Sequence, residues 1–265
     1  MITTKSSNKY KYDDTDKRVS NFIRNSVPKE IMQQATKSHL NFEKIFMRLI
    51  FGREDTWFQR EGTNALVRGV VGNVCANRYL ASQEYQVKNE VPIYDIQHKK
   101  VSASDIVLTS HRPFRQTFLE LKTTKAIILN EKDYPFEQDY SFGFGEYIPS
   151  ELMVFDHERS LPKLAVNSGQ KALQQLKKTR DHIALYERNG TSEAKLCVFK
   201  GTFLSDEFLR ELYNYNGLIT IPIDVERIFD YSSLLVEKIM TEGREMIQPT
   251  KGREPKIIEM PDLEL

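Results

Sequence analysis

Two acidic residues and a lysine near the middle of the chain have the types and spacing of a hydrolytic metal site. Asp105 lies in one alternating segment, and Glu120-Leu121-Lys122 lies in the next. If these segments are adjacent strands, the two carboxylates and the Leu121 carbonyl offer the hard oxygen ligands that Mg²⁺ prefers. Lys122 shares a strand face with Glu120, where it can position or deprotonate an attacking water. The pattern predicts metal-assisted hydrolysis of a phosphodiester.

The Glu-x-Lys spacing alone is weak, because it occurs three times. It recurs at Glu193-Ala194-Lys195, which opens a strand without an acidic hairpin partner, and at Glu254-Pro255-Lys256, in a proline-bearing tail. Only the first copy follows a helix and lies in a predicted hairpin. Burying two carboxylates and an ammonium among apolar residues costs free energy, which favours a functional role. The alternative is a surface ion pair on an ordinary sheet.

The elements that must position these residues are visible as changes of hydrophobic period. Alternation over 101–108 and 116–123, around a turn at 111–113, predicts a hairpin. A helix is expected over 61–83 and a strand over 85–94. Further on we expect helices at 168–186, 206–213 and 225–242 and strands at 195–203 and 217–223, with one or two helices in 28–52. This order predicts an α/β fold whose mixed central β-sheet is flanked by helices, with a helical N-terminal extension.

Small residues recur along one stripe of the helix expected over 61–83. Their spacing of three and four residues allows another element or a ligand backbone to approach closely. Because each glycine lowers helix propensity by roughly 1 kcal/mol relative to alanine, we expect close approach to offset that cost. The stripe consists of Gly62, Ala65, Gly69, Gly72 and Ala76.

The helix, the hairpin and the acidic positions resemble the PD-(D/E)XK nuclease superfamily, which has the restriction-endonuclease-like fold. The resemblance covers about residues 61–203. It implies that Asp105 and Glu120 bind the metal and that Lys122 orients the attacking water. Ser104 stands where the superfamily's name has proline, a position at which many members also lack proline.

Members of this superfamily often carry a further acid on the first helix, in a Gly-Glu pair. Here Gly72 is followed by Asn73, so that carboxylate is absent. We expect Glu61, at the start of the same helix, to replace it as a catalytic residue. The alternative is that Glu61 only interacts favourably with the positive N-terminus of the helix.

Candidate nucleic-acid contacts lie on two helices. On the helix after the hairpin, polar residues one turn apart form a face suited to phosphate contact, although a solvated helix face is the more common explanation of such a pattern. Arg68 on the first helix can steer phosphate. The set is Arg68, Lys171, Gln174, Gln175 and Lys178.

The 265 residues carry 38 Lys+Arg against 37 Asp+Glu, a net charge of +1, so global charge neither requires nor excludes nucleic acid. No apolar run is long enough for a membrane helix, and we expect no membrane partner and a cytoplasmic location. The two cysteines, Cys75 and Cys197, are expected to be buried thiols, because two cannot form a disulfide framework or a four-cysteine zinc site.

The expected organisation is a flexible arm (1–20), a single nuclease-like domain (21–245) and a tail (246–265). Within the domain, residues 130–160 form an acidic, aromatic insertion. Three interpretations of the insertion stand: aromatic packing on the core, a dimer or effector surface, or an acidic lid.

The sequence therefore predicts a Mg²⁺-dependent deoxyribonuclease, with Mn²⁺ as a substitute. An endonuclease in restriction or antiphage defence is the leading hypothesis, and a homodimer or higher homo-oligomer is expected because one site handles one strand at a time. Two alternatives remain open: a non-catalytic nuclease-fold subunit that binds DNA or a protein, and a repair or recombination exonuclease. RNA also remains open as a substrate.

Overall fold

The computed structural model describes residues 14–52, 57–111, 114–136, 161–186, 191–215, 217–247 and 258–261. The chain forms two compact units. The helical unit contains Met1–Asn64 and Ser233–Met260, and the sheet unit contains Ala65–Ser232 and Pro261–Leu265. The boundary between the units falls within two helices, α4 (Trp57–Ser82) and α8 (Val225–Ile247). The sequence analysis expected a single domain over 21–245 and did not predict this boundary.

The helical unit begins with a helix that the sequence analysis assigned to a flexible arm. Helix α1 covers Asp14–Ser26, and Val19 and Ile23, four residues apart, are both fully buried. Glu43 of α3 accepts hydrogen bonds from Ser20 Oγ at 2.7 Å and from Arg24 Nε at 2.8 Å. The arm prediction is therefore wrong from residue 14 onward. The stretch has few apolar residues among its charged ones, so its amphipathic helix is hard to recognise from the sequence.

Two further helices complete the N-terminal part of this unit. They are α2 (Lys29–Lys37) and α3 (Phe42–Phe51), which confirms the helical extension. Helix α3 begins where Asn41 caps it, because the Asn41 side chain accepts the backbone N–H of Lys44 at 2.9 Å. The apolar faces of these helices supply a core that includes Phe42, Phe46 and Ile31.

The predicted tail also contacts this unit. Ile258 is 8% exposed, and its carbonyl accepts a hydrogen bond from Lys238 Nζ at 2.8 Å. Its N–H donates to Glu242 Oε1 at 3.3 Å. These two contacts with α8 hold the short segment around residue 258, and the tail expected over 246–265 stays a prediction.

The sheet unit has a five-stranded sheet in the order β1-β2-β3-β5-β7. Its antiparallel half consists of β1 (Gln86–Tyr94), β2 (Lys100–His111) and β3 (Phe114–Lys122). Strands β5 (Ser192–Lys200) and β7 (Leu218–Asp224) continue from β3 in parallel. This confirms an α/β fold with a mixed central sheet flanked by helices.

A second, two-stranded sheet pairs β4 (Ala126–Ile127) with β6 (Phe203–Leu204). The strand predicted over 195–203 is thus two strands. Gly201 lies between them with φ +84°, a backbone conformation that glycine adopts without a steric penalty.

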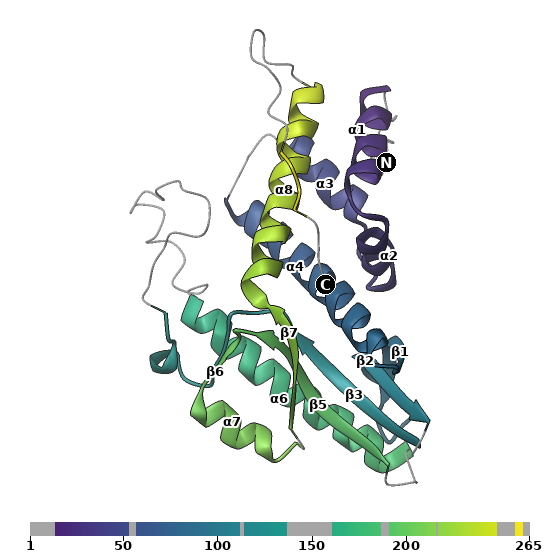
Figure 1. Cartoon of the computed structure of the whole chain (residues 1–265), viewed down its shortest axis with the longest axis vertical. Helices are drawn as coiled ribbons and strands as arrows, with labels where there is room; N and C mark the ends of the chain where they lie inside the picture. The colour runs from purple at the N-terminus through teal and green to yellow at the C-terminus, as the bar shows by residue number, and fades with distance from the viewer. Residues whose placement is uncertain are drawn as a thin grey trace, which may run out of the picture. The chain divides into compact units, whose positions relative to one another are not determined.

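Helix α6 (Leu161–Tyr186) covers one face of the five-stranded sheet (Figure 1). Its Ala172 and Leu176 are buried against Leu196 and Val198 of β5, in a cluster that also includes Phe208 of α7 (Asp206–Tyr213). Helix α6 begins at Leu161 rather than at Ser168, because Pro162 suits a first helical turn. The remainder of the predicted insertion contains a short 3₁₀ helix, Glu131–Asp133, and residues 137–160 lie outside the described residues.

Of the three glycines in the small-residue stripe on α4, Gly72 alone is closely approached by another element. A Cβ atom added to Gly72 would overlap Thr123 Oγ1, just after β3, whereas one added to Gly62 or Gly69 would meet nothing within 4 Å. Both cysteines are free and buried, as predicted.

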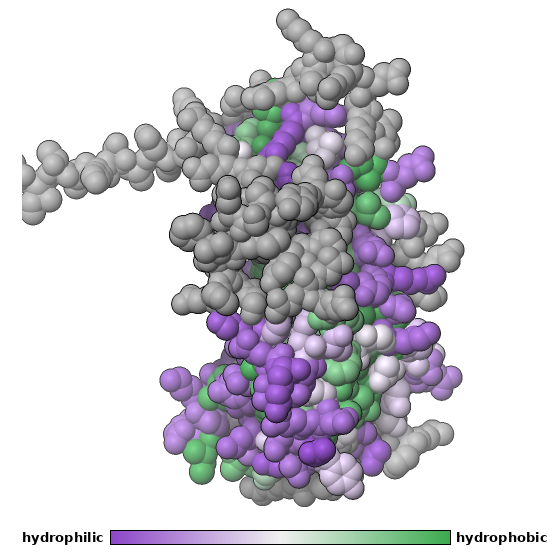
Figure 2. Space-filling view, turned by 90° about the vertical axis from the view of Figure 1, so that its left-hand side faces the viewer, coloured by the Kyte–Doolittle hydropathy of each residue, from purple (hydrophilic) through white to green (hydrophobic). Residues whose placement is uncertain are grey.

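Hydrophilic residues predominate on the described surface around α6 and α7, with smaller hydrophobic areas between them (Figure 2). Among the described helices, none combines the length and the apolar character needed to cross a bilayer.

Candidate active site

The hydrogen-bond ladder between β2 and β3 stops immediately before the two predicted metal ligands. Its final pair is Ile106↔Leu119, so the next pair in register would be Asp105 opposite Glu120. Here a side chain replaces the backbone: Asp105 Oδ2 accepts the N–H of Leu121 at 2.7 Å. The fold thus brings carboxylates from two neighbouring strands to the point where backbone pairing ends.

A serine hydroxyl ties the two strands together at the same point. Ser104 is 2% exposed, and its Oγ lies 3.1 Å from the carbonyl oxygen of Leu119 and 3.0 Å from that of Ile106. The Ser104 hydroxyl, a side-chain donor, therefore holds β2 to β3 next to Asp105.

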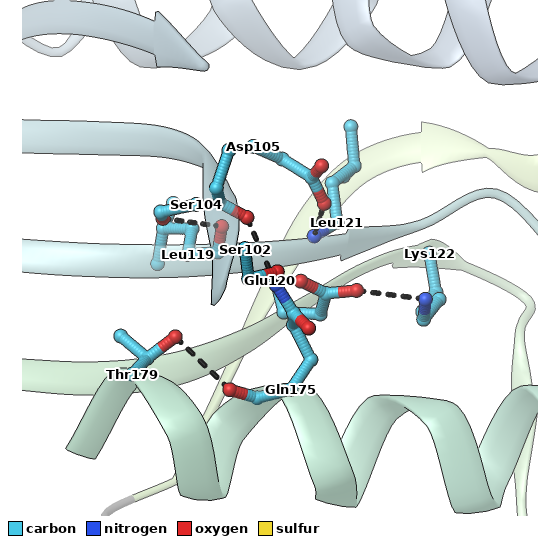
Figure 3. A network of polar contacts seen from close by, with 10 residues as sticks. Ser102, Ser104, Asp105, Leu119, Glu120, Leu121, Lys122, Gln175 and Thr179 are labelled. Atoms are coloured by element: carbon cyan, nitrogen blue, oxygen red, sulfur yellow. Dashed lines mark hydrogen bonds and ion pairs between the residues drawn. The ribbon is translucent and has the colours of Figure 1, made fainter. Parts of the chain in front are cut away.

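Glu120 and Lys122 form an ion pair along β3. Lys122 Nζ donates to Glu120 Oε1 at 2.8 Å, and the Lys122 and Glu120 side chains are 22% and 10% exposed. Figure 3 shows this pair extending from β3, while the Asp105 carboxylate reaches from β2 to the backbone at Leu121. Alternate positions on one strand explain the pair, since residues i and i+2 point the same way.

The second Glu-x-Lys copy makes the same ion pair in a different setting. Lys195 Nζ lies 2.9 Å from Glu193 Oε1 on β5. Glu193 also faces Arg115 at 3.9 Å and accepts a hydrogen bond from Thr117 Oγ1 at 3.2 Å. What distinguishes Glu120 is therefore not its lysine but the neighbouring carboxylate of Asp105.

A third acid, which the sequence analysis did not single out, lies beside this pair. The pairs Asn89↔Ile106 and Val91↔Ser104 bracket Glu90 of β1 and place it opposite Asp105. Glu90 has φ +52°, a left-handed conformation that non-glycine residues adopt at an energetic cost. An acid in the strand expected over 85–94 was the available signal, but its register with Asp105 was not visible.

Burial and mutual repulsion set the protonation of the carboxylates. Burial raises the pKa of Asp105, against the lowering effects of the Leu121 N–H and of Lys122, and the charge of Glu90 raises it further. Burial also raises the pKa of Glu120, the charge of Asp105 raises it again, and Lys122 opposes both effects. One lysine therefore does not neutralise the acids that surround it.

The structure brings together Asp105, Glu120, Leu121 and Lys122, four of the predicted site residues. Glu61 lies on the part of α4 that belongs to the helical unit, where its Oε1 accepts a hydrogen bond from Asn64 Nδ2 at 3.1 Å. Its catalytic role stays a prediction.

The predicted nucleic-acid contacts on α6 divide into two groups. Lys171 and Gln174 are exposed and Lys178 is half-buried, and their contact with phosphate stays a prediction. Gln175 instead turns toward β2, where its Nε2 donates to the carbonyl of Ala103 at 2.9 Å and contacts Ser102 Oγ. With both amide hydrogens used, Gln175 has none for a phosphate.

Arg68 shares an aromatic ring with a second cation. Its guanidinium carbon lies 4.4 Å from the ring centroid of Phe229, and Lys125 Nζ lies 5.0 Å from the same centroid. Lys125 also pairs with Glu226 at 2.5 Å. This places two positive charges close to the segment that follows β3.

The donor set suits a hard divalent cation. One oxygen of each carboxylate is hydrogen-bonded, to Leu121 and to Lys122, which leaves the second oxygen of each for a ligand. In a strand, the N–H and C=O of one residue point to the same side, so the Leu121 carbonyl also faces Asp105. Within the described part of the chain, no three His, Cys, Asp or Glu side chains gather as a ready-made metal cluster.

Comparison of the chain with protein-family models, with curated proteins and with solved structures finds no match in any of the three.

Proposed function

We propose that this protein is a Mg²⁺-dependent deoxyribonuclease, with Mn²⁺ as a substitute, whose site is built on Asp105 and Glu120. One observation carries the proposal. The buried carboxylate of Glu120 and the half-buried one of Asp105, on adjacent strands, repel each other, and a single lysine offsets that repulsion. Such an arrangement costs free energy unless a cation occupies it, and oxygen ligands favour Mg²⁺.

Asp105, Glu120 and the Leu121 carbonyl would hold the cation. When bound, it would supply Lewis acidity toward the phosphodiester and lower the pKa of a water. Lys122 then has a defined task in this site: its ammonium, held by Glu120, donates hydrogen bonds to an attacking water or to the negative charge that develops on phosphorus oxygens. The ion pair fixes the lysine before substrate arrives.

Cations near the end of β3 support a polyanionic substrate. Arg68 and Lys125 each lie over the ring of Phe229, and Lys171 is exposed on α6. Phosphate contacts by such groups give affinity without reading sequence. The resemblance to the PD-(D/E)XK superfamily favours DNA over RNA and an endonuclease of restriction or antiphage defence, acting as a homodimer when it cuts both strands.

The contacts also favour one alternative, a nuclease-fold subunit that binds DNA or protein without cleaving it. Lys122 and the Leu121 N–H already occupy one oxygen of each carboxylate. If these bonds persist and the pair shares a proton, the site holds no cation. Metal binding separates the two functions.

The test is cleavage of closed-circular and linear DNA, with single-stranded RNA in parallel, in Mg²⁺ or Mn²⁺. Wild type is expected to cleave DNA, and Glu120→Gln and Lys122→Ala are expected to lose activity at least about 100-fold. Glu193→Gln is the matched control, because it removes the acid of the other Glu-x-Lys pair. Nicking of closed circles identifies an endonuclease, and cleavage that persists in both site variants refutes the proposal.

A further inference from the structure

We propose that Gln175 is a positioning residue for Asp105, holding the segment of β2 that carries this carboxylate. The inference rests on the proposed function for its catalytic consequence, but its structural part stands on hydrogen bonds of α6 and β2 alone. Gln175 reaches β2 from a helix more than seventy positions later in the chain.

The acceptor of Gln175 is a carbonyl that the sheet does not satisfy. Ala103 pairs with Pro92 of β1, and proline has no N–H to donate. On the other side, the ladder between β2 and β3 has already ended at Ile106. Whichever neighbour the Ala103 carbonyl faces, no strand offers it a donor, and Gln175 Nε2 fills that place at 2.9 Å.

The second amide hydrogen of Gln175 is also directed to β2, toward Ser102 Oγ. The side chain therefore binds two consecutive residues, and Asp105 follows two positions after Ala103. Figure 3 shows the amide between α6 and β2, beside the Glu120 carboxylate.

The helix that carries Gln175 is itself fixed on the sheet. The neighbouring residues Ala172 and Leu176 are 0% and 1% exposed, in the cluster with Leu196 and Val198. Thr179 Oγ1 donates to the Gln175 carbonyl at 3.0 Å. An amide mounted on such a rigid element can define where β2 lies, as supporting residues around ligands do.

Three side chains thus take the place of ladder hydrogen bonds over a short stretch of β2. The Gln175 amide donates to the Ala103 carbonyl, and the Ser104 hydroxyl donates to the Leu119 carbonyl. The Asp105 carboxylate accepts the Leu121 N–H. Without Gln175, the segment ahead of Asp105 loses its anchor to α6. The Asp105 carboxylate then samples positions in which it no longer lies beside the Glu120 carboxylate.

The test compares Gln175→Met, which keeps length and loses both donors, with Gln174→Met, the same change at the adjacent exposed residue. The readouts are Mn²⁺ affinity by calorimetry, hydrogen exchange of the Leu121 amide by NMR, and kcat and KM on DNA. For Gln175→Met we expect Mn²⁺ affinity to fall about 10-fold, the Leu121 amide to exchange faster, and kcat to fall with KM unchanged. Gln174→Met is expected to match wild type in Mn²⁺ affinity and exchange.

If Gln175→Met does not fold, Gln175→Glu, similar in shape and without the amide donors when ionised, is measured in the same way. Wild-type Mn²⁺ affinity and Leu121 exchange in the folded variant would overturn the inference, as would a change in KM alone. If wild type itself neither binds Mn²⁺ nor cleaves DNA, the proposed function fails. The Leu121 exchange rate then decides by itself whether Gln175 positions Asp105.

Discussion

The carboxylate of Asp105 accepts the backbone N–H of Leu121 at 2.7 Å, so a side chain of β2 binds the main chain of β3 where the ladder between them has stopped. This contact ties the acid to the strand that carries Glu120 and Lys122. It also makes the acid part of the sheet, so substitutions at Asp105 are expected to affect stability as well as the proposed chemistry.

Removing the buried acid of Glu120 is expected to stabilise the metal-free protein at pH 8. Burial, with repulsion between the carboxylates, raises the pKa of Asp105 from 3.8 to about 6 and that of Glu120 from 4.5 to about 7. The folded state thus binds more protons than the unfolded state between about pH 4 and pH 7, and stability falls as pH rises through this window. In thermal melts, the melting temperature of Glu120→Gln should exceed that of wild type at pH 8, and the two melting temperatures should converge near pH 4.

The matched control for that experiment is Glu193→Gln. Its acid faces Lys195, Arg115 and Thr117 rather than a second carboxylate, so its removal relieves no repulsion between acids. If Glu193→Gln raised the melting temperature at pH 8 as much as Glu120→Gln does, that result would contradict the electrostatic explanation.

Divalent cations should raise the melting temperature of wild type. A cation that binds the folded site stabilises it in proportion to the logarithm of its concentration, by about 2.7 kcal/mol at 100 times the dissociation constant. Because binding uses both carboxylates, Asp105→Asn and Glu120→Gln should lose this increase, and EDTA should abolish it in wild type. If divalent cations raised the melting temperature of wild type and of both variants equally, the cation would bind at another site.

Two glycines of α4 should respond in opposite ways to alanine. At Gly69 a Cβ meets nothing within 4 Å, so Gly69→Ala should stabilise by about 0.5–1 kcal/mol through helix propensity. At Gly72 a Cβ would lie 2.9 and 3.0 Å from Cγ2 and Cβ of Thr123, and closer still to its Oγ1. Since rotation cannot remove all three clashes, Gly72→Ala should destabilise. Chemical denaturation measures both, and a Gly72→Ala protein as stable as wild type would disprove the close approach.

Charge on Arg68 and Lys125 should set part of the salt dependence of DNA binding. Removing one cation that neutralises a phosphate should reduce the slope of log K against log salt by about 1. Arg68→Ala and Lys125→Ala should each show this reduction in fluorescence anisotropy measured over a salt series in Ca²⁺. Arg68→Lys, which keeps the charge, should retain the wild-type slope; a slope unchanged in both alanine variants would remove these residues from the interface.

Local patterns were enough to predict the strands that carry Asp105 and Glu120, because alternation and a turn are properties of a short window. They could not reveal Glu90, whose place opposite Asp105 depends on strand register. Nor could they show that Gln175 faces β2. This contact depends on the pairing of Ala103 with Pro92 and on the packing of α6 against β2, and both arise only when the chain folds. Helix α1 was missed because the stretch before Val19 is charged and polar, and the apolar positions that continue its buried face, Ile23 among them, lie beyond residue 20, where the arm was expected to end.

The parallel run β3-β5-β7 has a consequence for how such a protein can diversify. Parallel strands end at a common edge, so the segments after β3, β5 and β7 converge there. Those after β3 and β5 are already tied by Thr202 Oγ1 to the Thr124 carbonyl at 3.0 Å and by the Phe203 N–H to the Lys125 carbonyl at 2.8 Å. Selection can therefore change these connecting segments while the strands beneath keep Asp105 and Glu120 in place.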